Sequence, residues 1–218
     1  MNEAEDGARV IDVVSDVVCP WCYIGKRRLE AALQRLDGSP PQIHWHPFQL
    51  NPDLPPEGVD RRSYVEAKFG GAERAAAIYA RVRAAGAAVG IAFDFDLIAR
   101  QPNTLGAHRL IAWAQSRGDA GALVERLFRA YFIEGAYIGD PAELERLAGE
   151  AGFDGDAAAA FLASDEGIAE VAGADRRARE LGIGGVPLFI FNRRVAVSGA
   201  QEPDTLLAAL AQSEAATA

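Results

Sequence analysis

Apolar positions recur with different periods along the chain. Residues 9–18, RVIDVVSDVV, are mostly β-branched and apolar, which is typical of a strand buried on both faces. A leucine series at helical spacing follows and ends at Gly38, which predicts a helix. Residues 42–50, QIHWHPFQL, then alternate between apolar and polar positions, so we expect a second strand closed by Pro47 and the loop NPDLPPEG. This first stretch therefore predicts a β-α-β unit.

The period becomes helical between about residues 60 and 182 and returns to strands afterwards. We expect helices over 64–82, from the cap Asn103 to Gly118, around 124–131, from the N-cap Asp140, and over 168–181. Two strands at 186–192 and 195–199 and a helix over 203–210 complete the chain. The abrupt return of strands indicates helices inserted into one α/β domain.

Charge and hydropathy narrow the functional classes. The chain has 31 acidic against 22 basic residues, a formal charge of −9, which argues against nucleic acid or an anionic membrane as a partner. No segment approaches the roughly 18 uninterrupted apolar residues of a membrane span. The acidic N-terminus has no basic and apolar regions of a secretory signal. We therefore predict a cytoplasmic protein, in a compartment where structural disulfides are rare.

The two cysteines of the chain, Cys19 and Cys22, form a CPWC motif between the first strand and the first helix. A bond between such close neighbours closes almost no loop and contributes little stability through chain entropy. Pro20 fits the first helical position and places Cys19 at the N-cap, where unpaired N–H groups and the helix dipole favour its thiolate. Cys22 begins the apolar stripe of the helix and should point inward. One exposed, activated sulfur beside one shielded sulfur is the arrangement that thiol–disulfide exchange requires, without metal or bound cofactor.

The cysteines allow two other interpretations. The pair could be inert core thiols or an accidental staple, but the strand–CxxC–helix context favours redox chemistry. A zinc site needs about four ligands and would have to recruit His44, His46 or His108, since the chain has no second CxxC. Redox exchange through a Cys19–Cys22 disulfide is therefore the leading hypothesis.

Residues around the motif allow two interpretations each. Asp16 is either a partly buried carboxylate that relays the proton of Cys22 or an edge-exposed acid. Trp21 lies inside the motif at an exposed turn, where it shapes the surface around the thiols. The basic run at residues 26–28 predicts a solvated helix face. The sequence does not determine whether the Val186–Pro187 bond is cis.

The segment SDVVCPWCYIGKRRLE, residues 15–30, and the later GIGGVPLFIF, residues 182–191, resemble DsbA-like thioredoxin-fold oxidoreductases of the FrnE type. Such proteins are related to 2-hydroxychromene-2-carboxylate isomerases and kappa-class glutathione transferases. HPFQLNPDLPPEG, QPNTLGAHRLI, AYFIEGAYIGD and VSGAQ extend the resemblance over nearly the whole chain. It implies an α/β thioredoxin domain made of residues 1–55 and 183–218. A large all-helical domain, residues 56–182, would be inserted between the βαβ and ββα halves, its last helix packed on the thioredoxin core.

The resemblance also implies roles at the redox centre. Cys19 would be the nucleophile and Cys22 the resolving thiol, with Pro20 and Trp21 between them. Pro187 would be a cis-proline facing the pair, and the Val186 backbone would be available to an extended substrate strand.

Binding residues are implied more loosely. Ser198 and Gln201 correspond to positions where glutathione-binding relatives hold the γ-glutamyl end of glutathione. Asn103 and His108 fall at the start of a helix that overhangs the site in such proteins. For His108 a satisfied helix histidine is an equal alternative.

The functional expectation is a dithiol–disulfide oxidoreductase that acts on thiol or disulfide substrates, either proteins or glutathione. The motif lacks the histidine that the strongly oxidising periplasmic enzymes carry between their cysteines. That histidine helps to stabilise the thiolate, so its absence favours a weaker oxidant than those enzymes. Related isomerases and transferases carry serine at the position of Cys19, which counts against those activities. A glutathione-dependent isomerase of small aromatic or polyketide substrates and a redox-sensing, chaperone-like binding module remain alternatives. The sequence does not determine the substrate, the direction of electron flow, or whether the protein is a monomer or a homodimer.

Overall fold

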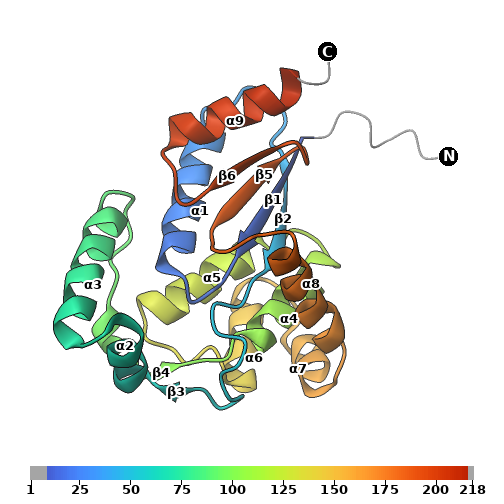
Figure 1. The fold of residues 1–218 in the computed structure, drawn as a ribbon. Coiled ribbons are helices and arrows are strands. Elements are labelled where there is room, and N and C mark those ends of the chain that lie inside the picture. The colour runs from blue at the N-terminus through green and yellow to red at the C-terminus, as the bar shows by residue number, and fades with distance from the viewer. Residues whose placement is uncertain (1–8, 216–218) are drawn as a thin grey trace.

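A four-stranded mixed sheet forms the centre of the computed structural model, which describes residues 9–215 (Figure 1). Its order is β2-β1-β5-β6, with β1 parallel to β2 and antiparallel to β5. The strands are β1 (Val10–Ser15), β2 (Gln42–Pro47), β5 (Leu188–Phe191) and β6 (Val195–Ser198). The order places the segment before the cysteines beside the segment after Pro187. The predictions for the extreme N-terminus and the last three residues lie outside the described residues.

Helices cover one face of this sheet and contact its edge strand β2. On one face, α1 (Pro20–Leu33) and α9 (Pro203–Ala215) pack against each other and over the buried rings of Phe189 and Phe191. At the edge of the sheet, α4 (Leu105–Gln115) and α8 (Ile168–Glu180) lie against β2. Residues from both ends of the chain thus share one core with the inserted helices.

The helical block lies at the end of the sheet where β1 leads into α1 (Figure 1). Besides α4 and α8 it contains α2 (Arg61–Phe69), α3 (Ala72–Ala87), η1 (Phe95–Leu97), α5 (Gly121–Phe132), α6 (Pro141–Glu150) and α7 (Gly155–Ala163), with a two-stranded ladder of β3 (Val59–Asp60) and β4 (Arg100–Gln101). The thioredoxin fold with inserted helices is confirmed, but the expectation of an all-helical insertion is wrong, because the inserted block contains the β3–β4 ladder. Within residues 9–215, every helix is too short or too polar to cross a bilayer.

Three predicted helices have different limits in the structure. The single helix predicted over 64–82 is two helices, because Gly70 and Gly71 take φ values of 75° and 118° that side-chain-bearing residues rarely adopt. The N-cap of α4 is Thr104 rather than Asn103, although the Asn103 amide oxygen accepts a hydrogen bond from the Leu105 N–H. The last helix runs five residues beyond the predicted end at Leu210, to Ala215.

Candidate active site at Cys19 and Cys22

Cys19 is the N-cap of α1, as predicted. Its backbone is extended, with φ −94° and ψ 112°, and Pro20 occupies the first helical turn. The Cys19 carbonyl accepts the Cys22 N–H at 3.0 Å, while its own N–H donates to the Asp16 carbonyl at 3.0 Å. Both thiols are free. The turn therefore holds the two cysteines one helical turn apart at the start of α1.

The two sulfurs are more alike in burial than expected. Cys22 is 2% exposed, which confirms that it points inward. The prediction that Cys19 is exposed is wrong, because Cys19 is only 5% exposed. Its thiol donates a hydrogen bond to the Val186 carbonyl with an Sγ–O distance of 3.7 Å, so the loop before β5 covers it. Trp21 lies between them and is 40% exposed, as expected for a surface residue.

The loop that covers Cys19 carries a cis peptide bond at Val186–Pro187, as the resemblance implied. Helix α1 accommodates Pro187 at Gly25, where a Cβ would lie only 3.0 Å from the proline Cγ. The Pro187 carbonyl accepts the Gly199 N–H at 2.8 Å. Helix α1, the loop before β5 and the turn after β6 therefore meet beside the thiols.

Burial raises the pKa of the Cys22 thiol well above its ordinary value, and the neighbouring Cys19 sulfur raises it further. The Ser15 hydroxyl and a backbone hydrogen bond from Asp16 act in the opposite direction, since each stabilises the Cys22 thiolate. Cys22 is consequently a neutral thiol at neutral pH.

Alkylation should reveal this difference. We expect iodoacetamide near pH 7.5 to modify Cys22 at least about tenfold more slowly than Cys19, because only the thiolate reacts and each unit of raised pKa removes about tenfold of it. Modification of Cys22 should accelerate as the pH rises toward its raised pKa. Tandem mass spectrometry of the peptide that carries both cysteines measures each site. Equal labelling at pH 7.5 would contradict the assignment.

Asp16 lies in the interior rather than at an edge. It is 0% exposed, so the edge-exposed interpretation is wrong. Its Oδ2 accepts the Leu50 N–H at 2.7 Å, and its Oδ1 lies 3.3 Å from Nε2 of His108. His108 on α4 is itself 4% exposed. The inserted helical block thus supplies a buried polar partner immediately behind the cysteine turn.

The other residues expected to bind substrate fall into two environments. The Asn103 amide donates to the Leu54 carbonyl at 2.7 Å and accepts from Gln49, so it holds the loop after β2. Ser198 and Gln201 are exposed. They flank Gly199, the residue bonded to Pro187, and the Gln201 amide donates to the Ser198 carbonyl at 2.9 Å. The structure therefore brings Ser198 and Gln201, but not the Asn103 amide, to the open side of the site.

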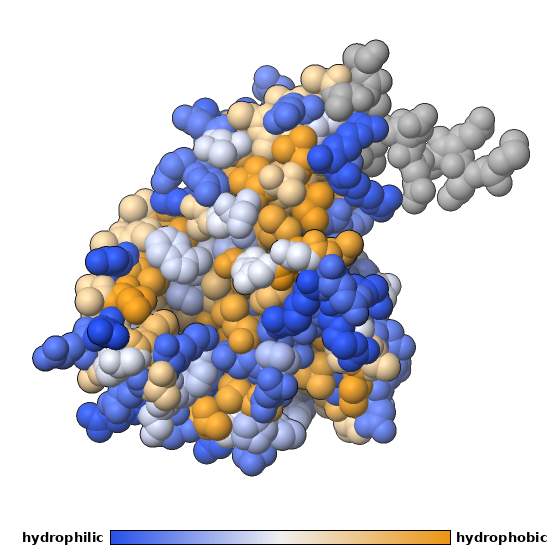
Figure 2. Space-filling model, viewed as in Figure 1, coloured by the Kyte–Doolittle hydropathy of each residue, from blue (hydrophilic) through white to orange (hydrophobic). Residues whose placement is uncertain are grey.

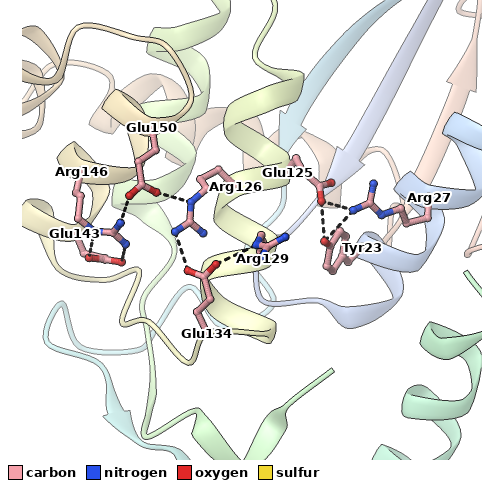
Figure 3. A network of polar contacts seen from close by, with 9 residues as sticks. All are labelled: Tyr23, Arg27, Glu125, Arg126, Arg129, Glu134, Glu143, Arg146 and Glu150. Carbon is pink, nitrogen blue, oxygen red and sulfur yellow. Dashed lines mark hydrogen bonds and ion pairs between the residues drawn. The ribbon is translucent and has the colours of Figure 1, made fainter. Parts of the chain in front are cut away.

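The basic run after the motif is not simply a solvated face. Lys26 is 5% exposed and pairs with Glu125 Oε2 at 2.8 Å. The Tyr23 hydroxyl donates to Glu125 Oε1 at 2.7 Å, and Arg27 bonds the same oxygen (Figure 3). Burial alone would raise the pKa of Glu125, but these bonds outweigh it and lower the pKa. The expectation failed because Glu125 comes from α5, far away in the sequence.

A second, more exposed network, separate from the first, joins α5, the loop after it and α6 (Figure 3). It joins three arginines to three glutamates: Arg126, Arg129, Arg146, Glu134, Glu143 and Glu150. Surface pairs of this kind stabilise little individually, so we assign them no part in the site.

Two of the three histidines considered for zinc contact Asp12 rather than the cysteines. His44 and His46 both approach the carboxylate of Asp12, at 3.6 and 2.7 Å. Over residues 9–215 there is no group of three or more His, Cys, Asp or Glu side chains that could hold a metal ion.

Comparison with known proteins identifies relatives over nearly the whole chain. The sequence profile of a family described as DSBA-like thioredoxin domain matches residues 10–211. An uncharacterized protein of Bacillus subtilis, YwbO, is 28% identical over 149 residues, which cover 66% of this chain and 67% of YwbO. A crystal structure of the probable DsbA oxidoreductase SCO1869 from Streptomyces coelicolor has a TM-score of 0.85 and 32% identity, with 95% and 90% of the two chains covered. The cytosolic disulfide reductase DsbM from Pseudomonas aeruginosa, solved with GSH, has a TM-score of 0.63 and 20% identity, with 95% and 96% covered.

Proposed function

Since the chain belongs to the DSBA-like thioredoxin domain family, we propose that it is a dithiol–disulfide oxidoreductase whose redox centre is Cys19–Cys22. The observation that carries this proposal is the pairing of an N-cap thiol with a buried thiol one helical turn later, beside the cis-proline Pro187. The Cys19 sulfur lies at the positive end of the α1 dipole, which stabilises negative charge, although no backbone N–H of α1 donates a hydrogen bond to it. The second sulfur is kept neutral until it is needed.

The reaction proceeds in two exchanges. The Cys19 thiolate attacks one sulfur of a substrate disulfide, forms a mixed disulfide and releases the other substrate sulfur as a thiolate. Cys22 then loses its proton and attacks Cys19, which forms the Cys19–Cys22 disulfide and releases the second substrate thiolate. Two electrons pass from the protein to the substrate, and the reverse sequence oxidises a dithiol substrate. An extended substrate segment would pair with the Val186 backbone, next to the exposed ring of Trp21.

We propose glutathione as the co-substrate of this chain. A structurally similar disulfide reductase was solved with GSH, and here Ser198 and Gln201 are exposed on the turn bonded to Pro187. A cytoplasmic location, where the glutathione pool is reducing, fits a reductase with this co-substrate. The apolar surface between the sheet and the helical block, flanked by charged residues (Figure 2), offers contact area for a larger disulfide substrate.

A redox titration tests the proposal. The reduced protein is equilibrated with glutathione buffers of graded potential, and Trp21 fluorescence and thiol alkylation are followed together; a Trp21→Phe variant isolates the contribution of that indole. We expect one reversible two-electron transition, with Cys19 and Cys22 oxidised together. If both thiols stay reduced in oxidised glutathione, the proposed function is wrong.

A further inference from the structure

Two buried polar atoms near the cysteine turn have no hydrogen-bond partner. They are the Ser15 hydroxyl oxygen, at the end of β1, and the indole Nε1 of Trp45 on β2. Ser15 is 6% and Trp45 7% exposed, so bulk water does not satisfy them. Unpaired buried polar atoms are uncommon in folded proteins and often mark an ordered water molecule.

Both residues line the same small cavity. Its volume is about 20 Å³, and it lies between β1, β2 and α4. His108 lines it as well, and the rest of its wall is mostly apolar. A cavity needs about 10–15 Å³ to admit one water molecule, which also needs two to four polar partners. The size and the three polar side chains therefore fit one water molecule.

Two residues that line the cavity, Ser15 and His108, lie next to the resolving thiol and the buried carboxylate respectively. On one side, the Ser15 hydroxyl is near enough to Cys22 to stabilise its thiolate, although it makes no hydrogen bond to the neutral thiol. On the other, Nε2 of His108 lies 3.3 Å from Asp16 Oδ1. When Nε2 of His108 donates to Asp16 Oδ1, its Nδ1 keeps a lone pair that can accept a proton.

We propose that this cavity holds one water molecule and that Ser15, the water and His108 carry away the proton of Cys22 during the resolution step. The proposal rests on the proposed function. As Cys22 attacks the mixed disulfide, its proton passes to the Ser15 oxygen and the Ser15 proton passes to the water. The water in turn protonates His108, whose positive charge is stabilised by Asp16. The Cys22–Cys19 bond forms, the Cys19–substrate bond breaks, and the substrate leaves as a thiolate.

The other titratable groups around the cavity are less suited than His108 to accept this proton. The Tyr131 phenol of α5 is buried and kept neutral by a raised pKa, and the Asp175–Arg179 pair of α8 is held on Gln49. His46 of β2 also lines the cavity, but its side chain is 48% exposed and bonded to Asp12.

A stoichiometric disulfide reagent such as dithiobis(nitrobenzoate) tests the route, because each exchange releases one coloured thiolate. We expect Ser15→Ala and His108→Gln to leave the first phase unchanged and to slow the second phase at pH 7 by at least about tenfold. The second phase of both variants should rise with pH more steeply than that of the unaltered protein, since hydroxide must replace the lost relay. His46→Gln is the matched control and should keep both phases.

The outcomes separate this inference from the proposed function. A merely structural role for Ser15 would not change the pH profile. Ser15→Ala removes a hydroxyl that makes no hydrogen bond to another protein group, so its melting temperature should stay near that of the unaltered protein. A second phase of unaltered rate and pH profile in both variants would overturn the relay, as would an empty cavity in a high-resolution crystal structure. A missing second phase in the unaltered protein would instead refute the proposed function.

Discussion

Cys19→Ser is expected to abolish dithiol–disulfide exchange, lowering the rate by about a thousandfold or more. Loss of the attacking nucleophile removes the covalent step on which every later step depends, and a serine hydroxyl is not ionised at neutral pH. The measurement is the rate at which the reduced protein opens a disulfide-bonded peptide, with peptide thiols counted over time. A variant that retained more than a tenth of the activity would contradict the assignment of Cys19.

Cys22→Ser supplies the control for that substitution, because it makes the same chemical change one helical turn away. It should keep the first exchange and then stop, so that one mixed disulfide per chain accumulates and is visible by intact mass. The same variant separates the enzyme classes. A glutathione-dependent isomerase would not need Cys22, whereas the oxidoreductase does. A chaperone-like module would keep its binding of unfolded chains in Cys19→Ser.

Most of the fold could be predicted because its signals are local. The β-branched stretch before Cys19 and the leucine spacing after it predict β1 and α1, and Asp140 with Pro141 marks the start of α6 correctly. The ladder of β3 and β4 was missed, since two-residue strands carry no periodicity. Gly70 and Gly71 were the visible signal for the break between α2 and α3, but the helical spacing on both sides masked it.

The site could be predicted where one segment contains both the chemistry and its environment, and not where distant segments meet. The N-cap position of Cys19 and the burial of Cys22 follow from the helix itself. The burial of Cys19 depends on Val186, and that of Lys26 on Glu125, two contacts that no local pattern contains. Ser15 was overlooked because a serine at a strand end has many ordinary roles; its signal is the missing hydrogen-bond partner.

The junction between the active-site helix and α5 should be the most sensitive part of the core. Tyr23 follows Cys22 directly, and its ring stacks on Phe128 with centroids 5.0 Å apart and an interplanar angle of 8°. Phe128 is 0% exposed and lies one turn after Glu125, whose carboxylate holds the Tyr23 hydroxyl. A cavity at Phe128 would therefore open directly beneath the first turn of α1.

Phe128→Ala is expected to lower the free energy of unfolding by about 3–5 kcal/mol, because buried ring atoms are lost and the surrounding helices fill the space only in part. Typical domains have about 5–15 kcal/mol in all, so the loss is a large share. Urea denaturation of the reduced protein measures it as a lower midpoint with an unchanged slope. Phe69→Ala is the matched control: it deletes the same atoms from α2, where the ring is half-buried against Tyr79, and should cost about 1 kcal/mol. Equal losses in the two variants would mean that the packing of Tyr23 on Phe128 does not anchor the active-site helix to the inserted block.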